Sequence, residues 1–271
     1  MDNPRRRPPT RETSLPITVE FMRRIAEAAA AETLPRFRSQ GEVTNKLSAG
    51  FDPVTEADRG AERAIRALIN AEFPDHGILG EEYGAENVDN SHVWVIDPID
   101  GTRAFISGLP VWGTLVGLTV EGDAVAGMMA QPFTGELYYA DGAGAHYEGP
   151  GGGRRLSTRA TTALADATLF TTTPALYEGD KRQRFDRLEA LVRLSRYGVD
   201  CYAFAMLAAG SADLVIEAGL QPYDIVALIP IIEQAGGIIT TFDGGPAENG
   251  GDVLAAATRE LHAAAMEVLR A

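Results

Sequence analysis

The chain has 271 residues, of which 45% are hydrophobic, so it is long enough to bury a large core in one domain or two tightly joined subdomains. Its formal net charge of −14 argues against a surface that binds nucleic acid by neutralising phosphates. The single cysteine, Cys201, cannot form an internal disulfide bond, and no apolar run approaches the roughly 20 residues that span a bilayer. We therefore expect a cytoplasmic protein without a nucleic-acid or membrane partner.

The first half of the chain predicts helices followed by antiparallel strands. Residues 1–16 are rich in arginine and proline without an apolar core, which indicates a disordered tail rather than a secretory signal. Apolar residues at helical spacing predict helices over 17–39 and 56–73, the second capped by Thr55 and ended by Pro74. Short apolar runs predict strands at 77–80 and 92–96, and turn signals at 121–123 and 134–135 predict a meander over 112–147.

The second half of the chain has a different pattern. The glycine-rich stretch 147–154 is the best candidate for a boundary between subdomains of about 17–149 and 150–271. Beyond it, strand-like and helix-like segments alternate, which favours an α/β half after an α+β half. The strands are expected at 167–172, 213–218 and 237–242, and the helices at 181–194, 202–209 and 225–235.

The sequence WVIDPIDGT at 94–102 places two aspartates, Asp97 and Asp100, at the end of a short apolar strand. Carboxylates three residues apart are well placed to share hard cations, and oxygen-only ligands suit magnesium. The carbonyl of Ile99 offers a further oxygen, and Gly101 and Thr102 begin a short helical turn whose N–H groups would face a phosphate. The alternative is a turn with aspartate caps and no ligand.

Three further acidic segments favour the metal site. Glu81 and Glu82 follow a predicted strand, and Asp58 and Asp224 each stand at the start of a predicted helix. Taken singly, these are a solvated pair and two acids favoured by the helix dipole. Their occurrence together with Asp97 and Asp100 favours a shared cation cluster.

These segments resemble the motifs of the inositol monophosphatase superfamily. The matching sequences are GEE at 80–82, WVIDPIDGT at 94–102, PYD at 222–224 and EQAGG at 233–237, and the resemblance covers essentially the whole chain after the tail. It implies a mixed α/β and α+β fold, a layered αβαβα sandwich with the metal site in the first half and specificity residues in the second. It also implies a magnesium-dependent phosphomonoesterase that commonly forms homodimers and is inhibited by lithium.

The resemblance further implies a role for each matching residue. Two or three Mg²⁺ ions would be held by Glu81, Asp97, the Ile99 carbonyl, Asp100 and Asp224. Asp58 would support a metal-bound water and pair with Thr102, while Glu81 and Thr102 orient that water for in-line attack. The substrate-binding set would be Asp100, Gly101, Thr102, Arg103, Arg196, Asp200, Glu217 and Asp224.

Other phosphatase chemistries lack their residues in this chain. Cys201 is followed by YAFAML, without an arginine placed for a phosphate-binding cysteine loop, and no histidine lies in the acidic motifs. The aspartates of DPID are one residue too far apart for a DxD nucleophile, and no GxxxxGK[ST] loop is present. Metal-activated water remains.

The substrate is predicted from Asp200 and Glu217. Two acids suit a cationic amino alcohol better than a neutral polyol, because an ammonium group gains charge-assisted hydrogen bonds. The surroundings of these acids resemble the histidinol-phosphate phosphatases of the superfamily, which implies hydrolysis of L-histidinol phosphate in histidine biosynthesis. Arg103 and Arg196 are candidate phosphate-side cations or surface arginines, and Asp200 is alternatively a helix cap. An inositol or other sugar phosphatase, and a non-catalytic interaction protein on the same fold, stay open.

Overall fold

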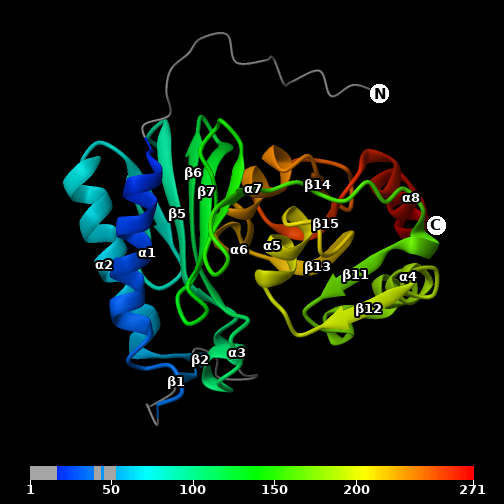
Figure 1. Ribbon diagram of the computed structural model, residues 1–271, viewed down its shortest axis with the longest axis horizontal. Helices are drawn as coiled ribbons and strands as arrows, with labels where there is room; N and C mark the ends of the chain where they lie inside the picture. Colours follow the sequence, from blue (N-terminus) through cyan, green and yellow to red (C-terminus); the bar gives the residue numbers. More distant parts are fainter. Residues whose placement is uncertain (1–16, 40–43, 46–52) are drawn as a thin grey trace.

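The computed structural model describes residues 17–39, 44–45 and 53–271, so the expected tail at 1–16 lies outside the described residues. Two β-sheets and three groups of helices form five layers, in the order helix, sheet, helix, sheet, helix (Figure 1). This arrangement confirms the expected mixed α/β and α+β fold, a layered αβαβα sandwich. No helix among the described residues is long and apolar enough to cross a membrane.

The first sheet has eight strands, and its central strands carry the site. Their order is β10-β9-β8-β7-β6-β5-β3-β4, and all neighbours are antiparallel except β3 and β5. The bounds are β3 (Gly77–Gly80), β4 (Gly84–Glu86), β5 (His92–Asp100), β6 (Gly113–Val120), β7 (Asp123–Gln131), β8 (Glu136–Ala140), β9 (Ala145–Glu148) and β10 (Arg154–Arg155). The glycine-rich stretch 149–153 forms the turn between β9 and β10, and the chain passes to the second sheet after it.

The second sheet has five strands in the order β12-β11-β13-β15-β14. Its strands are β11 (Thr168–Thr171), β12 (Leu194–Tyr197), β13 (Leu214–Leu220), β14 (Ile238–Thr241) and β15 (Gly251–Ala256). The parallel pairs β11 with β12 and β11 with β13 agree with the expected α/β half. A short antiparallel pair, β1 (Thr44–Asn45) with β2 (Pro53–Val54), lies apart from both sheets.

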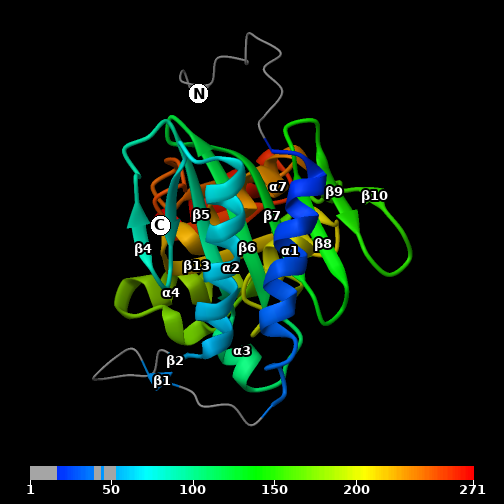
Figure 2. The same cartoon turned by 90° about the vertical axis from the view of Figure 1, so that its left-hand side faces the viewer.

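The helices cover the sheets on three levels. Helices α1 (Val19–Thr33) and α2 (Glu56–Glu72) lie side by side on the outer face of the first sheet (Figure 2). Between the sheets lie α5 (Tyr202–Ala208), α6 (Pro222–Ile225) and α7 (Leu228–Gln234), and the outer layer contains α4 (Gly179–Glu189) and α8 (Arg259–Arg270). Helix α3 (Thr102–Ile106) follows β5 directly.

Apolar clusters fill the interfaces between the layers. Met22, Ile25 and Ile65 of the outer helices pack on Trp94 of the first sheet, and all four are fully buried. A second cluster fills the space between the sheets, and a third lies under α4 and α8. Burial of this apolar surface is the main favourable contribution to folding.

Proline explains two differences from the expected helices. The helix expected over 17–39 ends at Thr33, because Pro35 has no N–H to continue the bonding pattern. The helix expected over 225–235 is divided into α6 and α7, because Pro230 cannot donate to the carbonyl of Val226. The charged helix expected to reach residue 194 ends at Glu189, since Leu194–Tyr197 pairs with β11 instead.

Candidate active site

Strand β5 brings Asp97 and Asp100 to the edge of the first sheet. Its pairing with β6 is regular up to Asp97, opposite Leu115, and shifts before Asp100 pairs with Gly113. Pro98 lies in this irregular stretch, where the N–H of Ile99 donates to Oδ1 of Asp97 at 3.0 Å instead of to a strand partner. The irregularity holds both carboxylates at the strand end.

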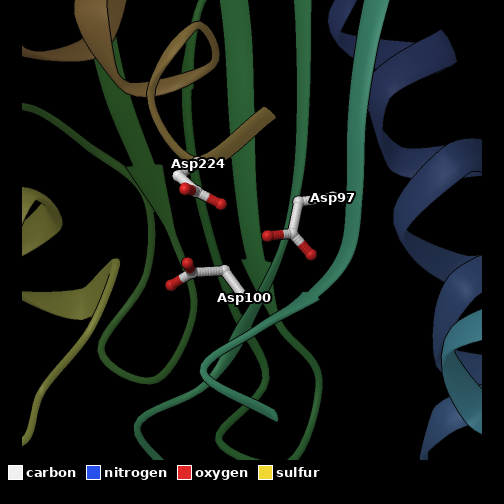
Figure 3. A group of neighbouring side chains, drawn as sticks. All are labelled: Asp97, Asp100 and Asp224. Carbon is white, nitrogen blue, oxygen red and sulfur yellow. The ribbon is translucent and has the colours of Figure 1, made fainter. Parts of the chain in front are cut away.

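Asp224 joins them from between the two sheets. It is the third residue of α6, and its Oδ2 accepts the N–H of Gln221 at 2.7 Å in a capping box. The side chains of Asp97, Asp100 and Asp224 point toward one another (Figure 3). One carboxylate oxygen from each lies within 4.8 Å of the others, an arrangement suited to a hard cation.

The electrostatics of this cluster also favour a cation. Asp97 is only 2% exposed, and its pKa is raised well above the ordinary value by burial and then by the charges of Glu81, Asp100 and Asp224. The pKa of Asp100 is raised by burial and by Asp200 and Asp224. Several carboxylates in one buried space repel one another unless positive charge is added, so the residues fit a divalent metal.

Glu81 and Asp58 lie beside the cluster. Glu81 follows β3, and its N–H donates to the carbonyl of Ile96 on β5 at 3.1 Å. Its charge raises the pKa of both Asp97 and Asp58, so it is close to both. Burial raises the pKa of Asp58 to about 6, against the opposing effect of hydrogen bonds from Thr55.

The pairing of Asp58 with Thr102 is absent from the hydrogen bonds among the described residues. Oδ2 of Asp58 accepts the hydroxyl of Thr55 at 2.6 Å and its N–H at 2.7 Å, which caps α2. The hydroxyl of Thr102 donates to the carbonyl of Ile99 at 3.1 Å. Asp58 is therefore held by its own helix, and Thr102 by the strand end that carries the aspartates.

Gly101 connects the cluster to the second half of the chain. It precedes α3 in the left-handed conformation, with a φ of 82°. A Cβ at this position would lie 3.0 Å from Oδ2 of Asp200. A glycine is needed here for its backbone conformation and for this close approach.

A cavity of about 180 Å³ adjoins the aspartates. It is lined by Asp100, Thr172, Leu176, Asp200, Cys201, Phe204, Glu217, Ala218, Leu220 and Asp224. Four of these residues are acidic and none is basic. The N–H of Cys201 donates to Oδ2 of Asp100 at 2.6 Å, which joins the cavity to the aspartate cluster.

Asp200 and Glu217 both line this cavity, and both hydrogen-bond to Thr172. Glu217 is 3% exposed, and burial raises its pKa to about 8, with smaller contributions from Asp200 and Asp224. Burial also raises the pKa of Asp200, while hydrogen bonding to Thr172 and the charge of Arg103 lower it. The structure thus brings together the two acids that the sequence assigned to substrate choice.

The two candidate arginines lie in different places. Arg103 is exposed at the first turn of α3, near enough to Asp200 to lower its pKa. Arg196 is exposed on the edge strand β12, opposite Phe170, and is not among the residues that line the cavity. Of the two, only Arg103 lies near the acids of the cavity.

Sequence reasoning missed two residues that support the site. Thr172 hydrogen-bonds to both Asp200 and Glu217. Glu62, fully buried in α2, accepts the N–H groups of Glu82 and Tyr83 at 2.7 and 3.2 Å and so fixes the segment that carries Glu81. The sequence offered one signal for Glu62: it lies four residues before Arg66, a helical spacing, and the two side chains form an ion pair at 2.8 Å.

The model of the inositol monophosphatase family matches residues 16–271. The chain belongs to this family. It is 38% identical over 257 residues to the bifunctional phosphatase IMPL2 of Arabidopsis thaliana, covering 90% of this chain and 72% of that protein. It is also 38% identical over 226 residues to a histidinol-phosphatase of Chlorobaculum parvum, covering 81% and 84%.

Other relatives are named as inositol monophosphatases. An inositol-1-monophosphatase of Rhizobium meliloti is 36% identical over 240 residues, covering 83% of this chain and 89% of that protein. A solved inositol monophosphatase of Zymomonas mobilis superposes with a TM-score of 0.82 at 38% identity, covering 93% of this chain and 97% of that one. The chain is therefore a phosphatase of the inositol monophosphatase family, as the motifs indicated, and its relatives have two substrates in their names.

Proposed function

We propose that this family member is a Mg²⁺-dependent phosphomonoester hydrolase that converts L-histidinol phosphate to L-histidinol and phosphate. The observation that carries the proposal is the cavity beside the aspartate cluster, which four carboxylates line without a basic side chain. Asp100 and Asp224 belong to the cluster, whereas Asp200 and Glu217 face the space for the leaving group. A cationic leaving group would offset the charge of the second pair.

The first pair belongs to a set of five oxygen donors that fits a metal. Glu81, Asp97, the Ile99 carbonyl, Asp100 and Asp224 are hard oxygen donors of the kind that Mg²⁺ prefers. Bound there, two or three Mg²⁺ ions would lower the pKa of the attacking water and offset the charge on the phosphate.

The chain's own residues would orient the water and the ester. Glu81, which is close to Asp97 and Asp58, would accept the water's proton. Thr102 donates its hydroxyl proton to Ile99, which leaves its oxygen free to accept a hydrogen bond from the water. The phosphate would lie against Asp100, Gly101, Thr102 and Asp224, and Arg103 would approach from the exposed side.

An inositol phosphatase is the alternative, because several relatives have that name. With a pKa raised to about 8, Glu217 would stay largely protonated beside a neutral polyol, whereas a cationic leaving group would favour its ionised form and gain a charge-assisted hydrogen bond. A non-catalytic interaction protein would have no use for the repulsion between the crowded aspartates. We also propose, from the sequence and family resemblance, a cytoplasmic homodimer.

Replacement of Asp200 by asparagine tests the substrate. Asparagine tolerates the positive φ of 39° at this position better than alanine does, so the variant Asp200→Asn removes the charge with little strain. We expect the KM for L-histidinol phosphate to rise by about tenfold, the loss of roughly 1.4 kcal/mol of a charge-assisted contact. The KM for glycerol 2-phosphate, a neutral ester, should change much less in a phosphate-release assay.

The exposed Asp123 of β7 provides the matched control. Asp123→Asn makes the same chemical change at a turn outside the cavity and should leave both KM values as they are. An equal rise in KM for both esters in Asp200→Asn would contradict the proposal that Asp200 contacts a cationic leaving group.

A further inference from the structure

Thr172 lines the cavity and hydrogen-bonds to two of its acids, Asp200 and Glu217. It follows β11 directly, at the carboxyl end of a strand that runs parallel to β12 and β13. Glu217 comes from β13, and Asp200 precedes α5. Thr172 thus joins residues that lie 28 and 45 positions away in the sequence.

Two contacts of Thr172 hold one carboxylate oxygen of Glu217. Its N–H donates to Oε1 of Glu217 at 2.6 Å, and its hydroxyl lies 3.1 Å from the same oxygen. The hydrogen bonds that the described residues make to Glu217 both end on Oε1. Since Glu217 lines the cavity, its other oxygen is left for a ligand.

The hydroxyl of Thr172 also lies 3.3 Å from Oδ1 of Asp200. A hydroxyl has one proton, so it donates to only one carboxylate at a time. The N–H already donates to Glu217, and the hydroxyl lies within hydrogen-bond distance of both acids, so it ties the position of one to that of the other. Within the described part of the chain, no other side chain hydrogen-bonds to both acids.

We propose that Thr172 is a specificity-determining residue: it fixes Asp200 and Glu217 as one cation-binding edge for the ammonium end of an amino-alcohol phosphate. This inference rests on the proposed function, because it assigns the selection of the cationic leaving group to that pair. Without the hydroxyl, the two carboxylates would move apart, and the site would lose selectivity for the cationic ester over neutral ones.

The test compares selectivity rather than activity alone. The ratio of kcat/KM for L-histidinol phosphate to kcat/KM for glycerol 2-phosphate is measured in the wild type, Thr172→Val and Thr172→Ser. We expect the ratio to fall about tenfold in Thr172→Val and to recover most of its value in Thr172→Ser, which keeps the hydroxyl. A purely structural role would lower both kcat/KM values equally and leave the ratio unchanged, which would overturn the proposal.

Binding of the product L-histidinol tests the role of Thr172 independently of catalysis. L-Histidinol should raise the Tm of the wild type and of Thr172→Ser, but much less that of Thr172→Val. Thr173→Val is the matched control, because its hydroxyl accepts the N–H of Ala175 and does not line the cavity. An equal Tm rise in Thr172→Val and wild type would contradict the inference.

The outcomes distinguish an error in the proposed substrate from an error in the role of Thr172. If the wild type does not prefer the histidinol ester, the proposed substrate is wrong, and with it the cation that Thr172 would select. If the wild type prefers it and Thr172→Val keeps the same ratio, the substrate stands and the role of Thr172 is wrong.

Discussion

Individual carboxylates in this protein are placed for function at a cost in stability. Asp97 is almost fully buried beside Glu81, Asp100 and Asp224, and its pKa is raised well above the ordinary value near 4. A buried acid with a raised pKa contributes most to stability at low pH, and this contribution is lost as pH rises. The metal-free protein should therefore lose stability as pH rises above about 4, the ordinary pKa of an aspartate.

Asp97→Asn should separate stability from activity. The variant keeps an oxygen to accept the N–H of Ile99 but removes one charge from the cluster. In EDTA at pH 8 we expect its free energy of unfolding to exceed that of the wild type by about 1 kcal/mol or more, since one pKa unit corresponds to ~1.4 kcal/mol. The gain should shrink toward pH 4, as measured by urea unfolding.

The same variant should lose activity. Even partners outside the metal's ligand shell contribute roughly 10- to 100-fold, so phosphate release with Mg²⁺ should fall at least about 100-fold. A metal-free variant no more stable than wild type at pH 8 would show that the aspartates do not repel one another as described.

The residues of the site could be predicted from the sequence, but many of their contacts could not. Asp97, Asp100 and Asp224 follow a strand or start a helix, and such ends meet at a sheet edge. Thr172 was missed because its partners come from two other segments, and no local pattern connects them. The capping of α2 by Thr55 was expected from position, and the bond from Thr55 to Asp58 belongs to the same local capping box.

At the scale of elements, the site depends on how closely the α6–α7 segment lies on the first sheet. Ala227, between these helices, packs directly on β7: a Cβ on Gly127 would lie 2.1 Å from its carbonyl oxygen. Because Asp224 is on α6, this close contact sets its distance from Asp97 and Asp100.

Gly127→Ala should therefore damage both stability and activity. The added methyl group cannot fit without a backbone shift, and we expect a loss of about 1–3 kcal/mol, typical of overpacking. The displaced α6 should also weaken Mg²⁺ activation, seen as a higher Mg²⁺ concentration for half-maximal rate. Gly153→Ala, exposed in the β9–β10 turn with its nearest neighbour at 3.6 Å, is the control. Unchanged Mg²⁺ dependence in Gly127→Ala would contradict the role of this contact.

Elements with a clear period or a turn signal were predicted well, as α2 and the β6–β7 hairpin show. The last strand and helix, β15 and α8, were missed. The helix expected over 181–194 was extended too far, to the first residue of β12, and the strand Leu194–Tyr197 itself was not predicted because its pairing with β11 is set by tertiary structure. Local pattern does not contain that information.

At the scale of the whole molecule, the site lies between the two sheets. The first sheet contributes Asp97 and Asp100, the second contributes Glu217, and the helices between them contribute Asp224. The first sheet and α6 thus provide the acids that we propose to bind metal, and the second sheet and the segment before α5 provide those that we propose to face the leaving group. With a net charge of −14, the protein repels an anionic ester, and cations at the cluster would offset that repulsion locally.

The most direct test is a comparison of kcat/KM for L-histidinol phosphate and inositol 1-phosphate on the wild-type protein with Mg²⁺. We expect a preference for L-histidinol phosphate of at least about tenfold, equivalent to ~1.4 kcal/mol of transition-state stabilisation. EDTA should abolish both activities. A preference for inositol 1-phosphate would contradict the assignment of Asp200 and Glu217 to a cationic leaving group.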